Sequence, residues 1–407
     1  MLTVAYYIEL TWLLVDSMSG YFQNSGIFLP GNQTVGAVFR VFVLLFLVLI
    51  ILKYPKNDRH ITILSLLALA AFEVAFHGIF YSMSLPDVIS DYQFQSKILL
   101  SILLYRVLVI QWNHGNLGIE RIRKIVLFNA IVLLCNIVFG FVGIGFANYG
   151  VTEDGTPLGS KGFFYSGNEC SITFVVIYAL VIFVFGPRLK QHRAQFISLL
   201  FLFFLAGISL YSKTGILGYI LVTLFALYFY VPRVSKIRFA LVFAALLFAT
   251  SGFWSEVITA NIDRLRYFYQ LHPDFWDFIT SSRSDRIVEF QSLVSEARSP
   301  FPIIFGNGWW TRKAAPFSFE NDALDLLAAS GIFGLLIYLV WGGWFAVGVR
   351  TFLRSRSVDG AFVAYMMGLI LMMSVLVGHT MYSAMFAPFV ALVAAIPTRL
   401  IRGNTVQ

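Results

Sequence analysis

Long apolar stretches follow one another along almost the whole chain, separated by short polar connections. A helix needs about 20 mostly apolar residues to cross the ~30 Å hydrocarbon layer of a bilayer. The pattern therefore predicts an all-α polytopic membrane protein with about 12 transmembrane helices. The expected spans are residues 2–16, 36–53, 61–84, 95–112, 125–147, 168–186, 195–211, 214–231, 237–253, 323–348, 359–379 and 381–399.

Composition excludes a soluble fold. Hydrophobic residues make up 58% of the 407 positions and charged residues only 12%, whereas soluble domains carry about 25% charged residues. The spans leave no stretch for a separate soluble domain, so we expect a single transmembrane domain over residues 1–407.

The net charge of +8 follows from the distribution of basic residues between the spans. Five short connections rich in Lys and Arg fall on one side of the predicted topology, near residues 53–59, 121–124, 188–193, 233–238 and 350–356. The positive-inside rule assigns that side to the cytoplasm. Both termini are then cytoplasmic, and nucleic acid is not an expected partner.

One long connection, residues 255–320, lies on the outer side and is nevertheless rich in arginine. Within it, SSRSDRIVEFQSLVSEARSP predicts an amphipathic helix. Arg283 and Arg286 are three residues apart near the start of that helix, where free backbone amides also favour anions. This pair is a candidate clamp for a diphosphate. The alternative is that the arginines pair with Asp285 and Glu289, or extend to lipid headgroups.

The segment FENDALDLL places Glu320, Asp322 and Asp325 at the start of a transmembrane helix. A helix dipole stabilises carboxylates in a first turn, and this purely structural role explains Glu320 well. Asp325 lies one turn inside the apolar run, where an ionised group needs a partner.

Further candidates are predicted at the same outer face. Arg40 begins the second span, Lys161 and Asn168 belong to GSKGFFYSGNECS, Lys213 lies in a tight turn, and His379 lies between the last two spans. Taken singly, each cation is explained by a side chain extending to the lipid headgroups. Taken together with Arg283 and Arg286, they favour one anionic ligand, and a lipid diphosphate matches their depth and chemistry.

Two ionisable residues are predicted deeper in the bilayer. Glu73 and His77 are one helical turn apart, and this spacing predicts that they pair with each other as a structural unit.

The strings R..R, FGNGW and ENDALDLL..SGIFG, together with KGFFYSGNE and SKTG, resemble a superfamily of membrane enzymes. It contains the Wzy-type O-antigen or exopolysaccharide polymerases and the WaaL-type O-antigen ligases. Where ligases often have a His-Asn pair, this chain has Glu320 followed by Asn321, and that difference favours a polymerase.

The resemblance implies a glycosyltransferase of the type-C membrane class in the bacterial inner membrane, with its active site facing the periplasm. Donor and acceptor would be oligosaccharides linked to undecaprenyl diphosphate, and no metal or other cofactor is expected. A separate chain-length-regulating co-polymerase is an implied partner.

In the implied inverting reaction, Glu320 or Asp325 is the general base, and Arg283 and Arg286 stabilise the leaving diphosphate. Arg40, Lys161 and Lys213 assist them, with Asn168, Asp322 and His379 in the substrate site. The alternatives are a ligase that transfers the glycan to lipid A core and a polysaccharide flippase or other transporter.

Overall fold

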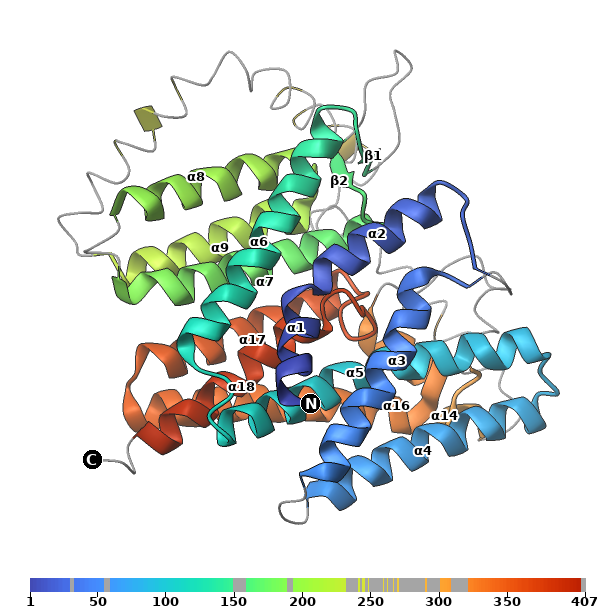
Figure 1. Ribbon diagram of the computed structural model, residues 1–407. Helices are drawn as coiled ribbons and strands as arrows, with labels where there is room; N and C mark the ends of the chain where they lie inside the picture. Colours follow the sequence, from blue (N-terminus) through green and yellow to red (C-terminus); the bar gives the residue numbers. More distant parts are fainter. Residues whose placement is uncertain are drawn as a thin grey trace. The chain divides into compact units, whose positions relative to one another are not determined.

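The computed structural model describes residues 1–29, 33–54, 59–148, 159–188, 193–231, 301–308 and 321–403, with isolated residues between 241 and 290. Within this part of the chain, almost every regular element is a helix (Figure 1). The elements are α1 Leu2–Leu10, α2 Trp12–Asn24, α3 Val35–Lys53, α4 Arg59–Phe80, α5 Leu85–Asn113, α6 Ile119–Phe141, β1 Phe146–Ala147, β2 Ser160–Gly162, α7 Gly167–Phe185, the 3-10 turn η1 Gly186–Arg188, α8 Arg193–Ser209, α9 Lys213–Phe229, α14 Phe301–Phe305, α16 Asp322–Ser355, α17 Val358–Leu376 and α18 Ala387–Gly403.

Seven of the described helices are long and apolar enough to cross a membrane, and three shorter apolar helices accompany them. The predicted all-α, polytopic membrane character is therefore confirmed. The count of twelve spans and the likeness to type-C glycosyltransferases stay predictions, and the expected span 237–253 lies outside the described residues apart from isolated positions.

Several predicted span boundaries were wrong, including the start of α5, which is at Leu85 rather than at residue 95. Two further differences lie near the ends of the chain. The stretch 2–16 is divided at Thr11 between α1 and α2, and the last helix begins at Ala387 rather than at residue 381. The second difference matters for function, because it leaves residues 377–386 as a loop instead of part of a helix.

The chain divides into two compact units, and α1 is shared between them. Unit 1 comprises residues 1–6, 37–117 and 274–407, and unit 2 comprises residues 7–36 and 118–273. Both units contain helices long and apolar enough to span a membrane, so neither is a separate soluble domain. The expectation of a single transmembrane domain stays a prediction.

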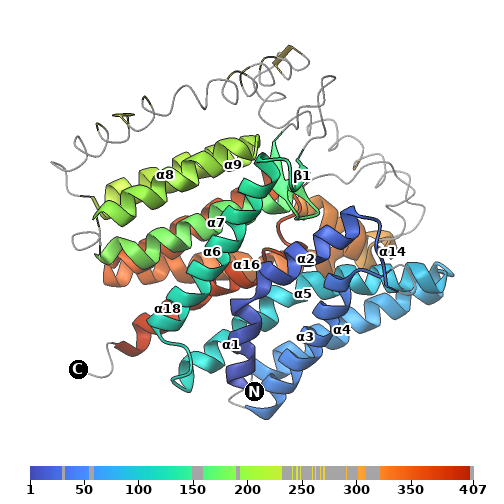
Figure 2. The same ribbon diagram turned by 45° about the horizontal axis from the view of Figure 1, so that its top comes forward.

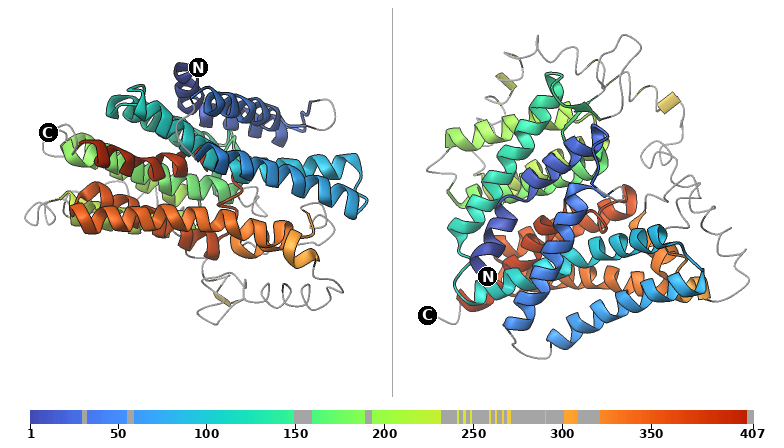
Figure 3. Two further views of the ribbon diagram at one scale, coloured as in Figure 1. Left: turned by 90° about the horizontal axis from the view of Figure 1, so that it is seen from below. Right: turned by 45° about the vertical axis from the view of Figure 1, so that its right-hand side comes forward.

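Within unit 1, α16 packs against α17, α18 and the short helix α14, while α5 packs against α4 and α18 (Figures 1 and 2). The helices α4 and α5 contact each other, as do α16 and α17; Figure 3 shows these helices from two further sides. Short connections between these helices explain the pairing, because neighbouring apolar helices joined by a few residues pack as antiparallel hairpins.

Within unit 2, α7 lies at the centre and contacts α6, α8 and α9. Its sequence is apolar on every side, and the run from Cys170 to Phe185 is buried throughout. A helix with no polar face is stable only where apolar groups surround it. The ribbon of β1 and β2 packs on α6, where Gly140 of α6 and Gly145, just before β1, admit the backbone of Gly162.

Helices α3 and α4 expose large apolar side chains. Phe42 of α3 is 67% exposed and Ile79 of α4 is 83% exposed, and both helices carry further exposed Leu or Phe residues. Soluble proteins rarely show apolar surfaces of this extent, so these faces are matched to lipid.

Candidate functional site

Asn321 begins α16 with a side-chain cap. Its Oδ1 accepts hydrogen bonds from the backbone amides of Ala323 and Leu324, at 3.1 and 3.2 Å. Asn is a favoured residue at this position because its short side chain satisfies amides that have no partner within the helix. The cap fixes the first turn of α16 and hence the directions of Asp322 and Asp325.

Asp322 is fully buried and binds the loop between α17 and α18. Its carboxylate accepts a hydrogen bond from the backbone amide of Met381 at 2.9 Å. The backbone amide of Thr380 lies 3.2 Å from one carboxylate oxygen and 3.0 Å from the other, and donates to both. Both oxygens therefore accept backbone amides. This arrangement indicates that Asp322 orders the loop. The substrate contact expected of Asp322 stays a prediction.

Asp325, also fully buried, accepts a hydrogen bond from the phenol of Tyr382 at 3.0 Å. The same phenol oxygen lies 2.9 Å from Nδ1 of His379. The ring of Tyr382 is further oriented by Phe94 of α5, with ring centres 5.3 Å apart. Asp325, Tyr382 and His379 thus form a chain of polar groups, which we call the α16 relay.

The backbone at His379 is in the left-handed region, with φ of +58°. Gly378 before it is also left-handed and ends α17, where its amide bonds to the carbonyl of Met373. A non-glycine residue in this region costs roughly 1–3 kcal/mol and persists only where its surroundings determine it. Here Asp322 fixes the backbone after His379, and Tyr382 binds its ring.

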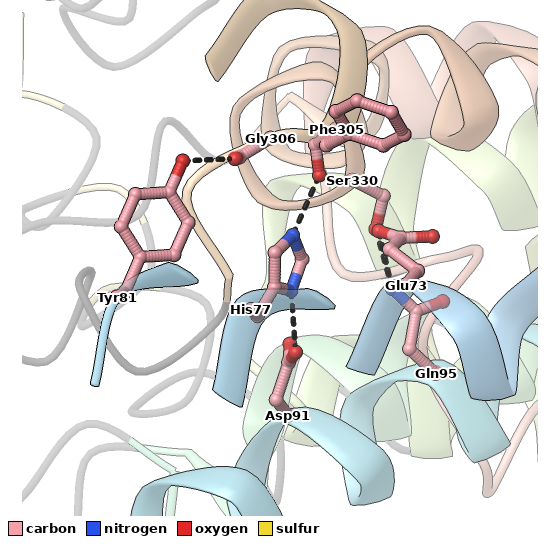
Figure 4. Close-up of polar contacts among 8 residues, drawn as sticks. All are labelled: Glu73, His77, Tyr81, Asp91, Gln95, Phe305, Gly306 and Ser330. Carbon is pink, nitrogen blue, oxygen red and sulfur yellow. Dashed lines mark hydrogen bonds and ion pairs between the residues drawn. The ribbon is translucent and has the colours of Figure 1, made fainter. Parts of the chain in front are cut away.

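A second polar cluster joins α4, α5 and the segment Phe301–Gly308 (Figure 4). The buried ring of His77 binds a carboxylate oxygen of Asp91 through Nδ1 and the carbonyl of Phe305 through Nε2, both at 2.6 Å. A carbonyl oxygen only accepts, so Nε2 carries a hydrogen. Tyr81 donates to the carbonyl of Gly306 at 2.8 Å.

The predicted pairing of Glu73 with His77 is wrong. Glu73 instead accepts a hydrogen bond from the amide nitrogen of Gln95 at 2.9 Å, and the same nitrogen donates to Ser330 of α16 at 2.6 Å. The reason is geometric: both side chains lie on the face of α4 that packs against α5, where Asp91 and Gln95 are one helical turn apart and offer better partners (Figure 4).

These contacts hold the turn Phe305–Gly308 against a break in α16. Gly331 has φ of +57° and ψ of −145°, which interrupts the helix. The carbonyls of Ala328 and Ala329 accept the amides of Asn307 and Gly308, at 2.9 and 3.0 Å. A membrane helix tolerates such a break only where other groups satisfy its backbone. The turn Phe305–Gly308 is thus part of the helix packing.

The cationic candidates fall in both units. Lys161 and Lys213 belong to unit 2, with Asn168 in the first turn of α7, and Arg40 belongs to α3 in unit 1. The ammonium of Lys161 donates to the carbonyl of Tyr165 at 2.6 Å. Partial burial lowers the pKa of Lys161, since loss of water disfavours its charged form.

Arg283, Arg286 and Glu320 lie outside the described residues, as does almost all of the expected amphipathic helix. Their roles therefore stay predictions. Among the described candidates, unit 1 brings Asp322, Asp325 and His379 together.

Sequence reasoning missed five side chains of these networks, namely Tyr81, Asp91, Gln95, Ser330 and Tyr382. Their signals were present but weak. Asp91 and Gln95 follow the spacing of one helix face, and Tyr382 follows His379 by three residues, but neither spacing identifies a partner on another element.

No family model, curated protein or solved structure matches the chain. The resemblance to Wzy-type polymerases therefore stays a prediction. Among the residues that the structure describes, no group of three or more His, Cys, Asp or Glu side chains is arranged to hold a metal ion.

Proposed function

We propose that this protein is a membrane glycosyltransferase that polymerises oligosaccharide repeats linked to a polyprenyl diphosphate. The observation that carries the proposal is the α16 relay: a buried carboxylate, a phenol and a half-buried imidazole meet at one end of a membrane helix. Ionisable groups within a membrane segment are costly and typically serve a function.

The position of the relay supports the same proposal. The end of α16 that contains Asp325 follows directly after the arginine-rich connection 255–320, while Arg350 and Arg354 lie at the opposite end of α16. The positive-inside rule assigns that opposite end to the cytoplasm. The relay would then lie on the periplasmic side, where the Wzy-type polymerases that the sequence resembles join lipid-linked repeats.

The proposed reaction is an inverting displacement. The hydroxyl oxygen of one repeat attacks the anomeric carbon of another, the bond from that carbon to the diphosphate oxygen breaks, and the polyprenyl diphosphate leaves. Arg283 and Arg286 would stabilise the charge that develops on the leaving group. A base must remove the hydroxyl proton. Asp325 is fully buried behind Tyr382, so it does not itself contact an acceptor.

The test is to supply purified protein in lipid nanodiscs with a lipid-linked repeat alone. A ladder of products that differ by one repeat, with release of polyprenyl diphosphate, is the expected result. A ligase would consume the donor only when a separate acceptor such as lipid A core is added. If neither condition releases lipid diphosphate, the proposal of glycosyl transfer is wrong.

The break at Gly331 favours a transporter as the second candidate, because interrupted helices form the binding sites of many transporters. In this protein, however, the turn Phe305–Gly308 bonds to the carbonyls at the break. A lipid-linked repeat with a fluorescent label, reconstituted in vesicles, distinguishes the two: a transporter moves the label between leaflets without releasing diphosphate.

A further inference from the structure

The α16 relay determines which nitrogen of His379 carries a hydrogen. The phenol of Tyr382 has one hydrogen, and it donates this to the carboxylate of Asp325 at 3.0 Å. The phenol oxygen can then only accept from Nδ1 of His379, 2.9 Å away. In a neutral imidazole the hydrogen is therefore on Nδ1, and Nε2 has an unshared electron pair.

That electron pair is available. In the part of the chain that the structure describes, Nδ1 is the ring nitrogen of His379 that has a hydrogen-bonding partner, and Nε2 has none. The ring is half-buried, in contrast to the fully buried side chains of Asp322 and Asp325 behind it. A nucleophile or acid–base group oriented by a second residue and supported by a third is a recurring catalytic arrangement.

We propose that His379 is the general base of the transferase, in place of Glu320, and that Tyr382 and Asp325 are positioning residues that keep Nε2 free of hydrogen. This inference rests on the proposed function. As the acceptor oxygen bonds to the anomeric carbon and the diphosphate departs, the hydroxyl proton transfers to Nε2. The imidazolium then releases that proton to water at the periplasmic face.

The backbone strain at His379 fits this assignment. Gly would adopt φ of +58° without cost, yet the chain places a histidine there between Gly378 and Thr380. The two amides after it are bound by Asp322. Backbone strain that the surroundings impose on a residue is typical of active sites.

One experiment tests, without any activity measurement, whether His379 has an accessible ring nitrogen free of hydrogen. Diethyl pyrocarbonate acylates a histidine at an unprotonated ring nitrogen, and mass spectrometry locates the product. We expect His379 to react and His77 to stay unmodified, since both nitrogens of His77 are bonded and its ring is buried. His114, at the end of α5, is an exposed reference. An unreactive His379 beside a reactive His114 overturns the proposal.

The second experiment measures turnover of the lipid-linked repeat. His379→Gln should lower kcat by about 100-fold or more, the usual range for loss of a general base, with little change in KM for the donor. The control His114→Gln should keep kcat within about 10-fold of the wild type, well short of that loss. Near-normal turnover by His379→Gln overturns the assignment.

Chemical rescue separates catalysis from structure. His379→Gly suits the left-handed backbone and should fold, and added imidazole should restore part of its turnover. Tyr382→Phe and Asp325→Asn should lose kcat while responding less to imidazole, because His379 still occupies the position. A folded, donor-binding His379→Gly variant that imidazole does not rescue contradicts the proposal. Inactive wild-type protein, by contrast, would refute the proposed function itself.

Discussion

The break in α16 gives the sharpest test of how this fold is stabilised. We consider Gly331→Ala. A Cβ at this position would overlap the carbonyl group of Ile304 and would lie 2.6 Å from the amide nitrogen of Gly306. Both neighbours are backbone atoms, so no flexible side chain can move aside. The φ of +57° adds strain for any residue other than glycine.

The expected loss can be estimated from these contacts. A strained backbone conformation of this kind costs about 1–3 kcal/mol. If the turn Phe305–Gly308 moves away, the bonds from Asn307 and Gly308 to α16 are lost, at about 0.5–1.5 kcal/mol each. Together these contributions amount to roughly 2–6 kcal/mol.

Gly343→Ala is the matched control. Gly343 lies in the same helix, and a Cβ there meets no atom within 4 Å. Its substitution should be neutral or should stabilise α16 by up to about 1 kcal/mol, the difference in helix propensity between Ala and Gly.

The assay is thermal unfolding of the purified protein in detergent, followed by tryptophan fluorescence and size-exclusion chromatography. We expect Gly331→Ala to lower the apparent Tm by about 5 °C or more, because 1 kcal/mol corresponds to roughly 2–4 °C for a domain of about 150–250 residues, and unit 1, which contains Gly331, falls in that range. A Tm for Gly331→Ala equal to that of Gly343→Ala would show that the turn does not pack into the break, and the reasoning would be refuted.

Three further predictions follow from the same structure. Asp322→Ala leaves the buried amides of Thr380 and Met381 without their acceptor and should destabilise the protein by about 2–4 kcal/mol. In the same unfolding assay Asp322→Asn should lose less stability, and equal losses for the two variants would contradict this role of Asp322. Tyr81→Phe should cost about 1 kcal/mol. Burial raises the pKa of Tyr81, so the stabilising effect of the Tyr81 hydroxyl is complete below pH ~10 and decreases as pH rises through the raised pKa. The measurement is Tm as a function of pH. If Tyr81→Phe shows the same decrease as the wild type, Tyr81 is not its cause. Arg283→Ala should abolish polymer in cells while protein level and membrane insertion stay normal, and normal chain lengths on a gel would remove Arg283 from the site.

The sequence by itself determined the class of fold, for a local physical reason. Transfer of an apolar stretch into lipid depends on the composition of that stretch and little on its neighbours, so hydropathy located helices such as α3, α7 and α17 to within a few residues. Caps were equally local: Ser166, Ser212 and Ser357 each accept an amide three residues ahead. The carboxylates of ENDALD were recognised as candidates because charge inside a membrane helix is costly.

Only the tertiary structure decided what these residues bind. Glu73 and His77 are one turn apart on α4 and still bind separate partners on α5. The packing of α4 against α5 brings Gln95 within hydrogen-bonding distance of Glu73 and Asp91 within hydrogen-bonding distance of His77. The partners of Asp322 and Asp325 lie 57 to 59 residues later in the chain. The break at Gly331 is also a tertiary feature: the apolar pattern of α16 is continuous through it, and only the turn Phe305–Gly308 supplies the amides that make a left-handed residue stable there. Hydropathy records what a residue prefers as its surroundings, whereas hydrogen-bond direction depends on which elements the fold brings together.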